Sequence, residues 1–217
     1  MMQPATPPRT STSAYRVLVP AAVGQLVSGL ESLWSIKQYR PDAILRGRAA
    51  SSTKSYLPMP LRRRLDTTAG AAVVHGLSIV GALLVLTGRS RRNQQIAGAA
   101  VTFAASKLFE IRNPFGRDGS DQMAGVIAGY RLAAVVVPDR EQSDDLFLRA
   151  VNAQTGLSYL ASGLAKLISS TWRSGEAMGQ VVRTDIYGGT WFSRLLERQP
   201  ILGKLVSWVT IAWETSF

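Results

Sequence analysis

The sequence predicts an all-α fold, a polytopic membrane bundle of about six spanning helices, and three observations lead to that prediction. Apolar residues make up 46% of the 217 residues, too many for a chain that is mainly disordered. Residues 67–88 contain no Asp, Glu, Lys or Arg, and about 20 apolar residues cross a bilayer core as a helix. The net charge is +11, and arginines cluster at the ends of the apolar blocks, as at 62–64 and 89–92.

The rarest residue types exclude several classes of site. The chain has no cysteine and a single histidine, His75. Disulfides, thiolate metal sites, cysteine nucleophiles and multi-histidine metal sites are therefore excluded, and we predict no metal site. Nucleic acid is not an expected partner, because the arginines lie at block ends and no nucleic-acid-binding motif occurs. The expected partner is the lipid bilayer, and the expected location is the cell membrane, with several passes.

The first expected helix covers residues 15–36. It follows a tail, residues 1–14, that is rich in Pro, Ser and Thr and is expected to be disordered. Polar side chains recur within the helix at helical spacing and form one stripe. A stripe facing lipid would be unfavourable, so it should face other helices or water. The stripe consists of Gln25, Ser28, Ser32 and Ser35.

Five further helices are expected, because each remaining apolar block is bounded by charged or turn-forming residues. Ala and Gly are dense in the second to fourth blocks, and small residues let membrane helices approach closely. Pro138 closes the fourth block, and the acidic run 139–145 is expected to form a turn. These helices should lie near residues 67–88, 94–111, 121–137, 146–170 and 200–217.

Residues 15–217 are expected to form one transmembrane domain. The last residues, WETSF, stop in an apolar context, so we expect this domain to be incomplete at its C-terminus. The distribution of Lys and Arg over the loops favours one side as cytoplasmic, whereas the short basic turn at 89–92 favours the other. The sequence therefore leaves the membrane orientation open.

Ionisable groups inside the spans are costly in lipid and are the first candidates for a role in packing or function. Arg131 lies in the middle of the fourth block and Glu110 near the end of the third, so we predict a buried ion pair between these two helices. His75 lies in the middle of the second block. It is either a neutral, hydrogen-bonded imidazole at a helix contact or a proton-handling group, since its unperturbed pKa is about 6.5.

The fifth block ends with a second pair of polar side chains, Ser162 and Lys166. Four residues apart, they lie on one helix face. A desolvated lysine loses its proton more easily and can activate a serine nucleophile. Lys166 is therefore the candidate catalytic base, with Ser162 beside it. The other interpretation is a lysine that extends to the lipid headgroups, with Trp172 as the interfacial anchor.

Two groups of residues resemble the motifs of one membrane-protein family. The first group is Ala161, Gly163, Lys166, Leu167, Trp172, Gly175 and Ala177. The second is Arg112, Asn113, Pro114, Gly119, Asp121 and Gln122. The family is the horizontally transferred transmembrane (HTTM) domain family, which includes the vitamin K-dependent gamma-carboxylases and a sporulation-delaying protein B-like bacterial group. The resemblance extends over residues 15–217.

The resemblance implies a membrane enzyme or an enzyme-like factor that matures or modifies a peptide. In the carboxylases the motif lysine is taken as the base that acts on vitamin K hydroquinone, and Lys166 occupies its position. It implies a quinone-type lipid as cofactor and a peptide substrate, with Arg112, Asp121 and Trp172 as the rim of a pocket. Two alternatives stay open. One is a non-catalytic membrane partner for export or immunity of a peptide toxin, and the other is a small transporter that uses Glu110 and Arg131.

Overall fold

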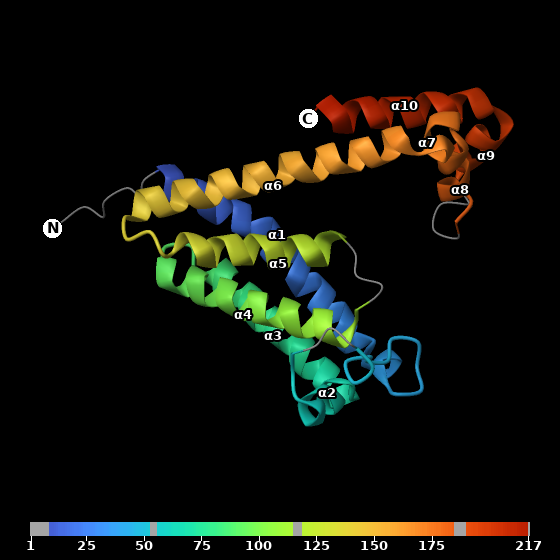
Figure 1. Cartoon of the computed structure of the whole chain (residues 1–217). Coiled ribbons are helices and arrows are strands. Elements are labelled where there is room, and N and C mark those ends of the chain that lie inside the picture. Colours follow the sequence, from blue (N-terminus) through green and yellow to red (C-terminus); the bar gives the residue numbers. More distant parts are fainter. Residues whose placement is uncertain (1–8, 53–55, 115–118, 185–189, 217) are drawn as a thin grey trace. The chain divides into compact units, whose positions relative to one another are not determined.

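A computed structural model describes residues 9–52, 56–114, 119–184 and 190–216, and every regular element within these ranges is helical. The prediction of an all-α fold is confirmed. The single domain expected for residues 15–217 divides into two units, Met1–Val151 and Asn152–Phe217. The long helix α6 (Arg140–Ile168) contributes its first turns to the first unit and its last turns to the second (Figure 1).

Four long helices form a closed ring of contacts in the first unit. α3 contacts α1 and α4, and α5 contacts the same two helices from the other side of the ring. The start of α6 and two short helical segments complete the unit (Figure 1). The elements before α6 are α1 (Arg9–Trp34), the 3-10 segment η1 (Ile36–Tyr39), α2 (Met59–Leu65), α3 (Thr68–Thr87), α4 (Arg92–Arg112) and α5 (Gly119–Ala134).

Glycines let α3 and α4 approach each other closely. A Cβ atom added at Gly81 would lie 2.8 Å from the backbone nitrogen of Thr102, and one added at Gly98 would lie 2.8 Å from the carbonyl oxygen of Gly81. Both distances are shorter than a van der Waals contact, so a larger residue would force the helices apart. The small residues of these blocks therefore serve helix packing, as the sequence predicted.

Two clusters of buried apolar side chains form the core of the first unit. The larger cluster joins α1, α3, α5 and the start of α6, and the smaller one joins α2, α3 and the segment before α2. Half of the residues in these two clusters are alanines, which suits helices that lie close together. The larger cluster consists of Ala14, Leu18, Ala22, Ala82, Val85, Ala134 and Phe147, and the smaller of Ala49, Leu65 and Val74.

α1 begins at Arg9, inside the tail that was expected to be disordered, and residues 1–8 lie outside the described part of the chain. The early start has a packing reason. Ala14 is buried in the larger core cluster, and the hydroxyl of Tyr15 donates to the carbonyl oxygen of Leu86 at 3.0 Å. These contacts bind the first turns of α1 to α3.

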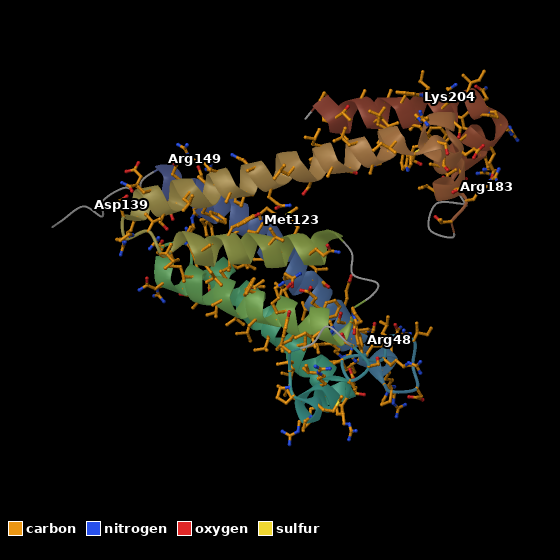
Figure 2. All side chains as sticks on the ribbon, viewed as in Figure 1. Arg48, Met123, Asp139, Arg149, Arg183 and Lys204 are labelled. Carbon is orange, nitrogen blue, oxygen red and sulfur yellow. The ribbon has the colours of Figure 1, made fainter. Side chains whose placement is uncertain are left out.

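α6 also begins earlier than expected, at Arg140, so most of the acidic run 139–145 is helical rather than a turn. Asp139 lies directly before this helix, and its Oδ1 accepts a hydrogen bond of 2.8 Å from the backbone N–H of Gln142 (Figure 2). An aspartate in this position satisfies a free N–H group at the helix start. The acidic residue that suggested a turn is the cap of the helix.

The second unit consists of the end of α6, three short helices and a longer last helix. α10 contacts each of the short helices. It also contacts the end of α6, where a Cβ added at Gly163 would lie 2.9 Å from the backbone nitrogen of Thr215. Gly175 has a φ of 89°, which glycine adopts readily, between the first two short helices. The elements are α7 (Ser170–Ser174), α8 (Glu176–Val182), α9 (Trp191–Arg198) and α10 (Pro200–Ser216).

Two of the described helices are long and apolar enough to cross a membrane. They are α1, over Ser11–Trp34, and α3, over Thr68–Thr87. This finding rests on length and composition, and it agrees with the predicted association with a membrane.

Candidate functional site

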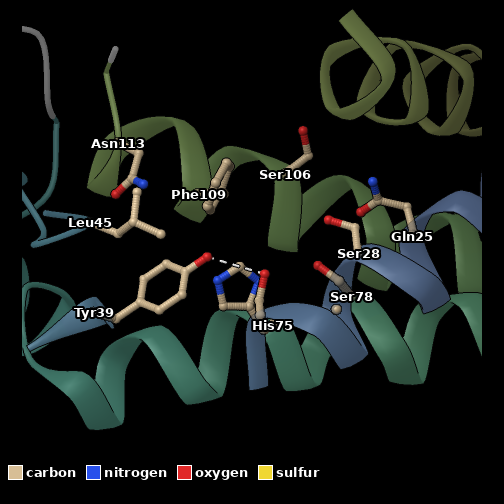
Figure 3. Close-up of a pocket in the computed structure, with 11 residues that line it drawn as sticks. Gln25, Ser28, Tyr39, Leu45, His75, Ser78, Ser106, Phe109 and Asn113 are labelled. Atoms are coloured by element: carbon tan, nitrogen blue, oxygen red, sulfur yellow. Dashed lines mark hydrogen bonds between the residues drawn. The ribbon is translucent and has the colours of Figure 1, made fainter. Parts of the chain in front are cut away.

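A polar cavity of about 220 Å³ lies between α1, α3, α4 and the segment around η1, and we call it the His75 cavity (Figure 3). Three of the four residues of the predicted polar stripe on α1 line it, as expected of side chains that face other helices or water. The cavity is lined by Gln25, Ser28, Gly29, Ser32, Tyr39, Leu45, His75, Ser78, Ser106, Phe109 and Asn113.

His75 lines the cavity from α3. Only 6% of its surface is exposed, and its ring lies edge-on to the rings of Tyr39 and Phe109, with centroid distances of 5.0 and 5.5 Å. The Nε2 atom is buried and has no hydrogen-bond partner. Buried polar atoms nearly always have a partner, and an unpaired one costs about 1–3 kcal/mol. At Nε2, the hydrogen bond expected by the first interpretation of His75 is therefore missing.

Hydroxyl and amide groups form the rest of the polar lining. The hydroxyl of Tyr39 donates to Oγ of Ser32 at 3.1 Å, which Figure 3 marks with a dashed line. The hydroxyl of Ser78 donates back to the carbonyl oxygen of Val74 in its own helix, at 3.3 Å. These side chains offer oxygen atoms and hydroxyl groups to a ligand without adding a formal charge.

Arg112, the last residue of α4, lies next to the cavity and is fully buried. Its guanidinium carbon lies 5.1 Å from the centre of the Tyr39 ring. Its Nε donates to the carbonyl oxygen of Leu65 at 3.0 Å, and one Nη donates to Oδ1 of Asn113 at 2.9 Å. Further bonds reach the carbonyl oxygens of Leu45 and Tyr39, at 3.3 and 3.4 Å. Arg112 was expected at a pocket rim, but these oxygens hold it in the interior.

The charge of Arg112 gives the cavity a positive environment. Each of its hydrogen bonds ends on a neutral oxygen. Arginine stays protonated in proteins, and the charge of the Asp66 carboxylate acts on that of Arg112. Asp66 itself accepts two backbone hydrogen bonds, from Ala49 at 2.7 Å and Ala50 at 2.8 Å. No carboxylate is among the residues that line the cavity.

The size and chemistry of the His75 cavity suit a small organic ligand. An apolar cavity of about 150 Å³ can hold a benzene molecule, so this cavity can hold a compound with one ring. Its aromatic edges can contact the carbon atoms of such a ligand, and its polar side can bind oxygen atoms. Within the described residues, no cluster of three or more His, Cys, Asp or Glu side chains could hold a metal ion.

Lys166 lies in the second unit and is held by three neighbours. Its Nζ donates to Oγ of Ser162 at 2.6 Å and to Oε2 of Glu214 at 2.5 Å. The same atom lies 5.1 Å from the centre of the Trp172 ring. Ser162 and Trp172 were the neighbours that the sequence suggested, and Glu214 was not expected. A general base directs a lone pair at its substrate, whereas this nitrogen directs its hydrogens at a serine and a glutamate.

A second cavity, of about 300 Å³, lies in the same unit as Lys166 but is not lined by it. Arg183 and Glu197 line this cavity and form an ion pair of 3.5 Å with each other. Both side chains are largely exposed, and exposed pairs of this kind contribute little energy. The cavity therefore lacks the buried, unpartnered group that distinguishes the His75 cavity.

The prediction that Arg131 forms a buried ion pair with Glu110 is wrong, because Arg131 pairs with a different carboxylate. Arg131 is buried as predicted, with 1% of its surface exposed, but its Nη1 pairs with Oδ1 of Asp144 at 2.6 Å. Glu110 instead pairs with Lys107 on the exposed face of α4, at 2.9 Å. The reason is the early start of α6, which makes the acidic run helical and places Asp144 in the interior.

Three further arginine contacts complete the buried cluster around Asp144. Nε of Arg92 lies 3.8 Å from Oδ1 of Asp144, and an Nη of Arg92 donates to Oγ of Ser143 at 2.8 Å. The guanidinium of Arg131 also lies 5.5 Å from the centre of the Phe147 ring. This cluster ties α4, α5 and α6 together and serves packing.

The three residues of the predicted pocket rim lie in different parts of the chain. Arg112 belongs to the first unit and Trp172 to the second. Asp121 lies in the first turn of α5, and its side chain is outside the described part of the chain. A rim formed by these three residues therefore stays a prediction.

The sequence contained a signal for some of the residues that the prediction missed. Ser78 follows His75 by three positions, so the two share a face of α3. On α4, the polar residues Thr102 and Ser106 form a stripe like that on α1, and the same reasoning could have placed them inside. Glu214 and Asp144 are different, because nothing local indicates their partners.

No protein-family model, no curated protein and no solved structure matches the chain.

Proposed function

We propose that the chain is a multi-pass membrane protein that binds a small molecule in the His75 cavity. The observation behind this proposal is the buried Nε2 atom of His75, which lacks a partner and belongs to a polar cavity surrounded by helices. The energetic cost of an unpaired buried atom is removed when a ligand supplies the missing hydrogen bond. The lining is preformed, as in most small-molecule sites.

The distribution of polar and apolar side chains supports a lipid environment. In α1 and α3, polar residues such as Gln25 and His75 are buried, while large apolar residues are exposed. Only 22% and 39% of the most apolar windows of these helices are buried, which supports helices whose apolar faces contact lipid. The exposed residues are Val23, Val27, Leu30, Val73, Val80 and Leu83.

The packing around α3 supports more than one crossing. α4 has 21 residues, and at about 1.5 Å per residue a helix of this length spans a hydrocarbon core of about 30 Å. Its glycine contact with α3 at Gly81 and Gly98 lies within both helices, so the two would share the same depth of the bilayer. α1 is the third member of this group.

The crossing by α3 can be tested on the natural cysteine-free background. Ser51→Cys and Ser90→Cys place single exposed thiols beyond opposite ends of α3. In intact cells, a membrane-impermeant maleimide should label one of the two variants, and permeabilisation should make the other reactive. Two variants that behave alike in intact cells would contradict a spanning α3.

Binding in the His75 cavity can be tested by thermal unfolding of the detergent-solubilised protein. Phenol, benzamide and benzoate are ring-sized probes with different polar groups. At least one should raise the melting temperature in a concentration-dependent way, because a ligand that binds the folded state stabilises it. His75→Phe should remove that rise. If no probe changes the melting temperature of the unmodified protein, this function is excluded for ligands of this size.

A second candidate function is the lysine chemistry implied by the HTTM resemblance, with a peptide or a quinone-type lipid as substrate. The observation in its favour is proximity, because Nζ of Lys166 lies 2.6 Å from Oγ of Ser162. Arginine keeps the positive charge but does not give up its proton near neutral pH, so a catalytic base predicts that Lys166→Arg and Lys166→Ala both abolish peptide maturation or immunity in cells. Full activity of Lys166→Arg would exclude catalysis and leave the non-catalytic partner.

A further inference from the structure

The charges around the His75 cavity are unbalanced. Arg112 is fully buried and bonds only to neutral oxygens, and no carboxylate lines the cavity. The ring of Tyr39 contacts both the His75 ring, at 5.0 Å, and the guanidinium of Arg112, at 5.1 Å. A buried positive charge is stabilised by a negative partner, and inside the cavity a ligand is the available source of one.

We propose that the ligand is a small organic monocarboxylate and that His75 takes up one proton from solvent when it binds. This inference rests on the proposed binding function and specifies its ligand class. In the empty cavity, an imidazolium would add a second buried positive charge beside Arg112, which is costly. The carboxylate that acts on Arg112, Asp66, does not line the cavity and so cannot pair with that imidazolium there. A ligand carboxylate supplies a counter-ion, and the protonated ring can donate a charge-assisted hydrogen bond from Nε2.

Among the described residues that line the cavity with His75, none is a carboxylate that could take up the proton or pair with the imidazolium. From η1, the hydroxyl of Tyr39 already donates to Ser32. From α4, the neighbours are the Phe109 ring and the Arg112 guanidinium, and α1 contributes neutral amide and hydroxyl groups. Asp66, after α2, is occupied by two backbone N–H groups and does not line the cavity.

The lining also selects the type of anion. The rings of Tyr39, His75 and Phe109 provide an apolar wall that suits the carbon skeleton of an organic acid. One imidazolium in the lining, with the buried charge of Arg112 behind the Tyr39 ring, matches a single carboxylate next to neutral hydroxyl groups. A phosphate dianion would need more donors and carries no apolar part for this wall.

The experiment uses the fact that His75 is the only histidine of the chain. The full-length protein, purified with a histidine-free tag and labelled with ¹⁵N-histidine, gives imidazole nitrogen signals from one residue. Benzoate and benzamide serve as matched probes, since they have nearly the same shape and differ in charge. Benzoate stays ionised above pH 6, because carboxyl groups titrate near about 4. Binding of each probe is measured by titration at pH 6, 7 and 8.

We expect benzoate to convert the His75 signals to those of imidazolium, with an affinity that rises up to about tenfold for each pH unit as the pH falls, since one proton is taken up. Benzamide should bind with no pH dependence. His75→Gln keeps a neutral donor and should remove the pH dependence of benzoate binding. If this variant does not fold, the signals of the unmodified protein decide the question.

Four results would overturn the inference. Benzamide binding as tightly as benzoate, or benzoate binding without a pH effect, would leave a ligand cavity and exclude proton-coupled carboxylate binding. Benzoate binding in His75→Gln with the original pH dependence would place the proton elsewhere. If neither probe binds at any pH, the inference and the binding function both fail for ring-sized ligands.

Discussion

His75 and Lys166 are ionisable side chains inside helices, and their surroundings are opposite. Lys166 contacts a serine, a glutamate and an aromatic ring within its own unit. His75 has aromatic neighbours, but its Nε2 has no hydrogen-bond partner. Lys166 is thus satisfied by the fold, whereas His75 is not. The contacts of Lys166 are those of a residue that stabilises the fold, whereas the unpaired Nε2 of His75 is what the proposed binding site would use.

The largest loss of stability is expected at a third buried ionisable group, Arg131, when its partner is removed. Asp144→Ala should lower the free energy of unfolding by about 3–5 kcal/mol, because it leaves a buried charge unpaired. The matched control is Asp145→Ala, which removes an exposed pair with Arg149 and should cost less than about 1 kcal/mol. Denaturant or thermal unfolding in detergent measures both. Similar losses in the two variants would mean that Arg131 is not held by Asp144.

The environment of Lys166 can be tested from its partner. Glu214→Gln keeps the shape of the side chain and removes its charge, so it should cost about 1.5–3 kcal/mol, the range for a hydrogen bond to a charged group. Glu197→Gln, in an exposed pair with Arg183, is the control and should change stability by less than about 1 kcal/mol. If Glu214→Gln does not change the stability of the protein, Lys166 would again be a candidate for a free catalytic base.

The close contact between α3 and α4, two of the helices around the His75 cavity, can be tested at the glycines of α3. Gly81→Ala should cost about 1–3 kcal/mol, because the added methyl group would overlap Thr102. Gly76→Ala lies in the same helix with no atom within 4 Å of the added Cβ. It should be neutral or stabilise the protein by up to about 1 kcal/mol through helix propensity. Equal melting temperatures for the two variants would show that α3 and α4 are not in close contact.

The smallest effect is expected at His75 itself. His75→Phe removes an unpaired polar atom, so stability should stay within about 0.5 kcal/mol or increase. Tyr39→Phe, in the adjacent ring, removes a hydrogen bond to Ser32 and should cost about 0.5–1.5 kcal/mol. Unfolding of the two variants without added ligand makes this comparison. A larger loss for His75→Phe would show that Nε2 has a structural partner.

The helices could be predicted from the sequence because their apolar blocks are long and their boundaries are marked by charge, Gly or Pro. The start of α6 could not, because Asp139 is as typical of a turn as of a helix cap. As a result, Asp144 was expected in a turn, whereas it lies in α6 and is buried. That ambiguity also explains why Glu110 was assigned to Arg131, since no buried carboxylate was then expected nearby.

The polar stripe on α1 was predictable, because helical spacing places its members on one face whatever lies opposite. The contents of the His75 cavity depend on which helices meet that face. Tyr39 comes from a segment expected to be an irregular loop, and Asn113 from a helix end. The Glu214 contact joins residues 48 positions apart, and no local pattern indicates such a distance.

The glycine contact between α3 and α4 has a consequence for which molecules the protein can accept. Gly81 lies only two turns of α3 from His75, and Gly98 lies on the helix that carries Ser106 and Phe109. The spacing of the two backbones at the glycines therefore sets the width of the gap between the cavity walls. For the ligand proposed above, these two glycines, which do not line the cavity, would then set the size limit, and widening their contact by one methyl group would admit bulkier compounds.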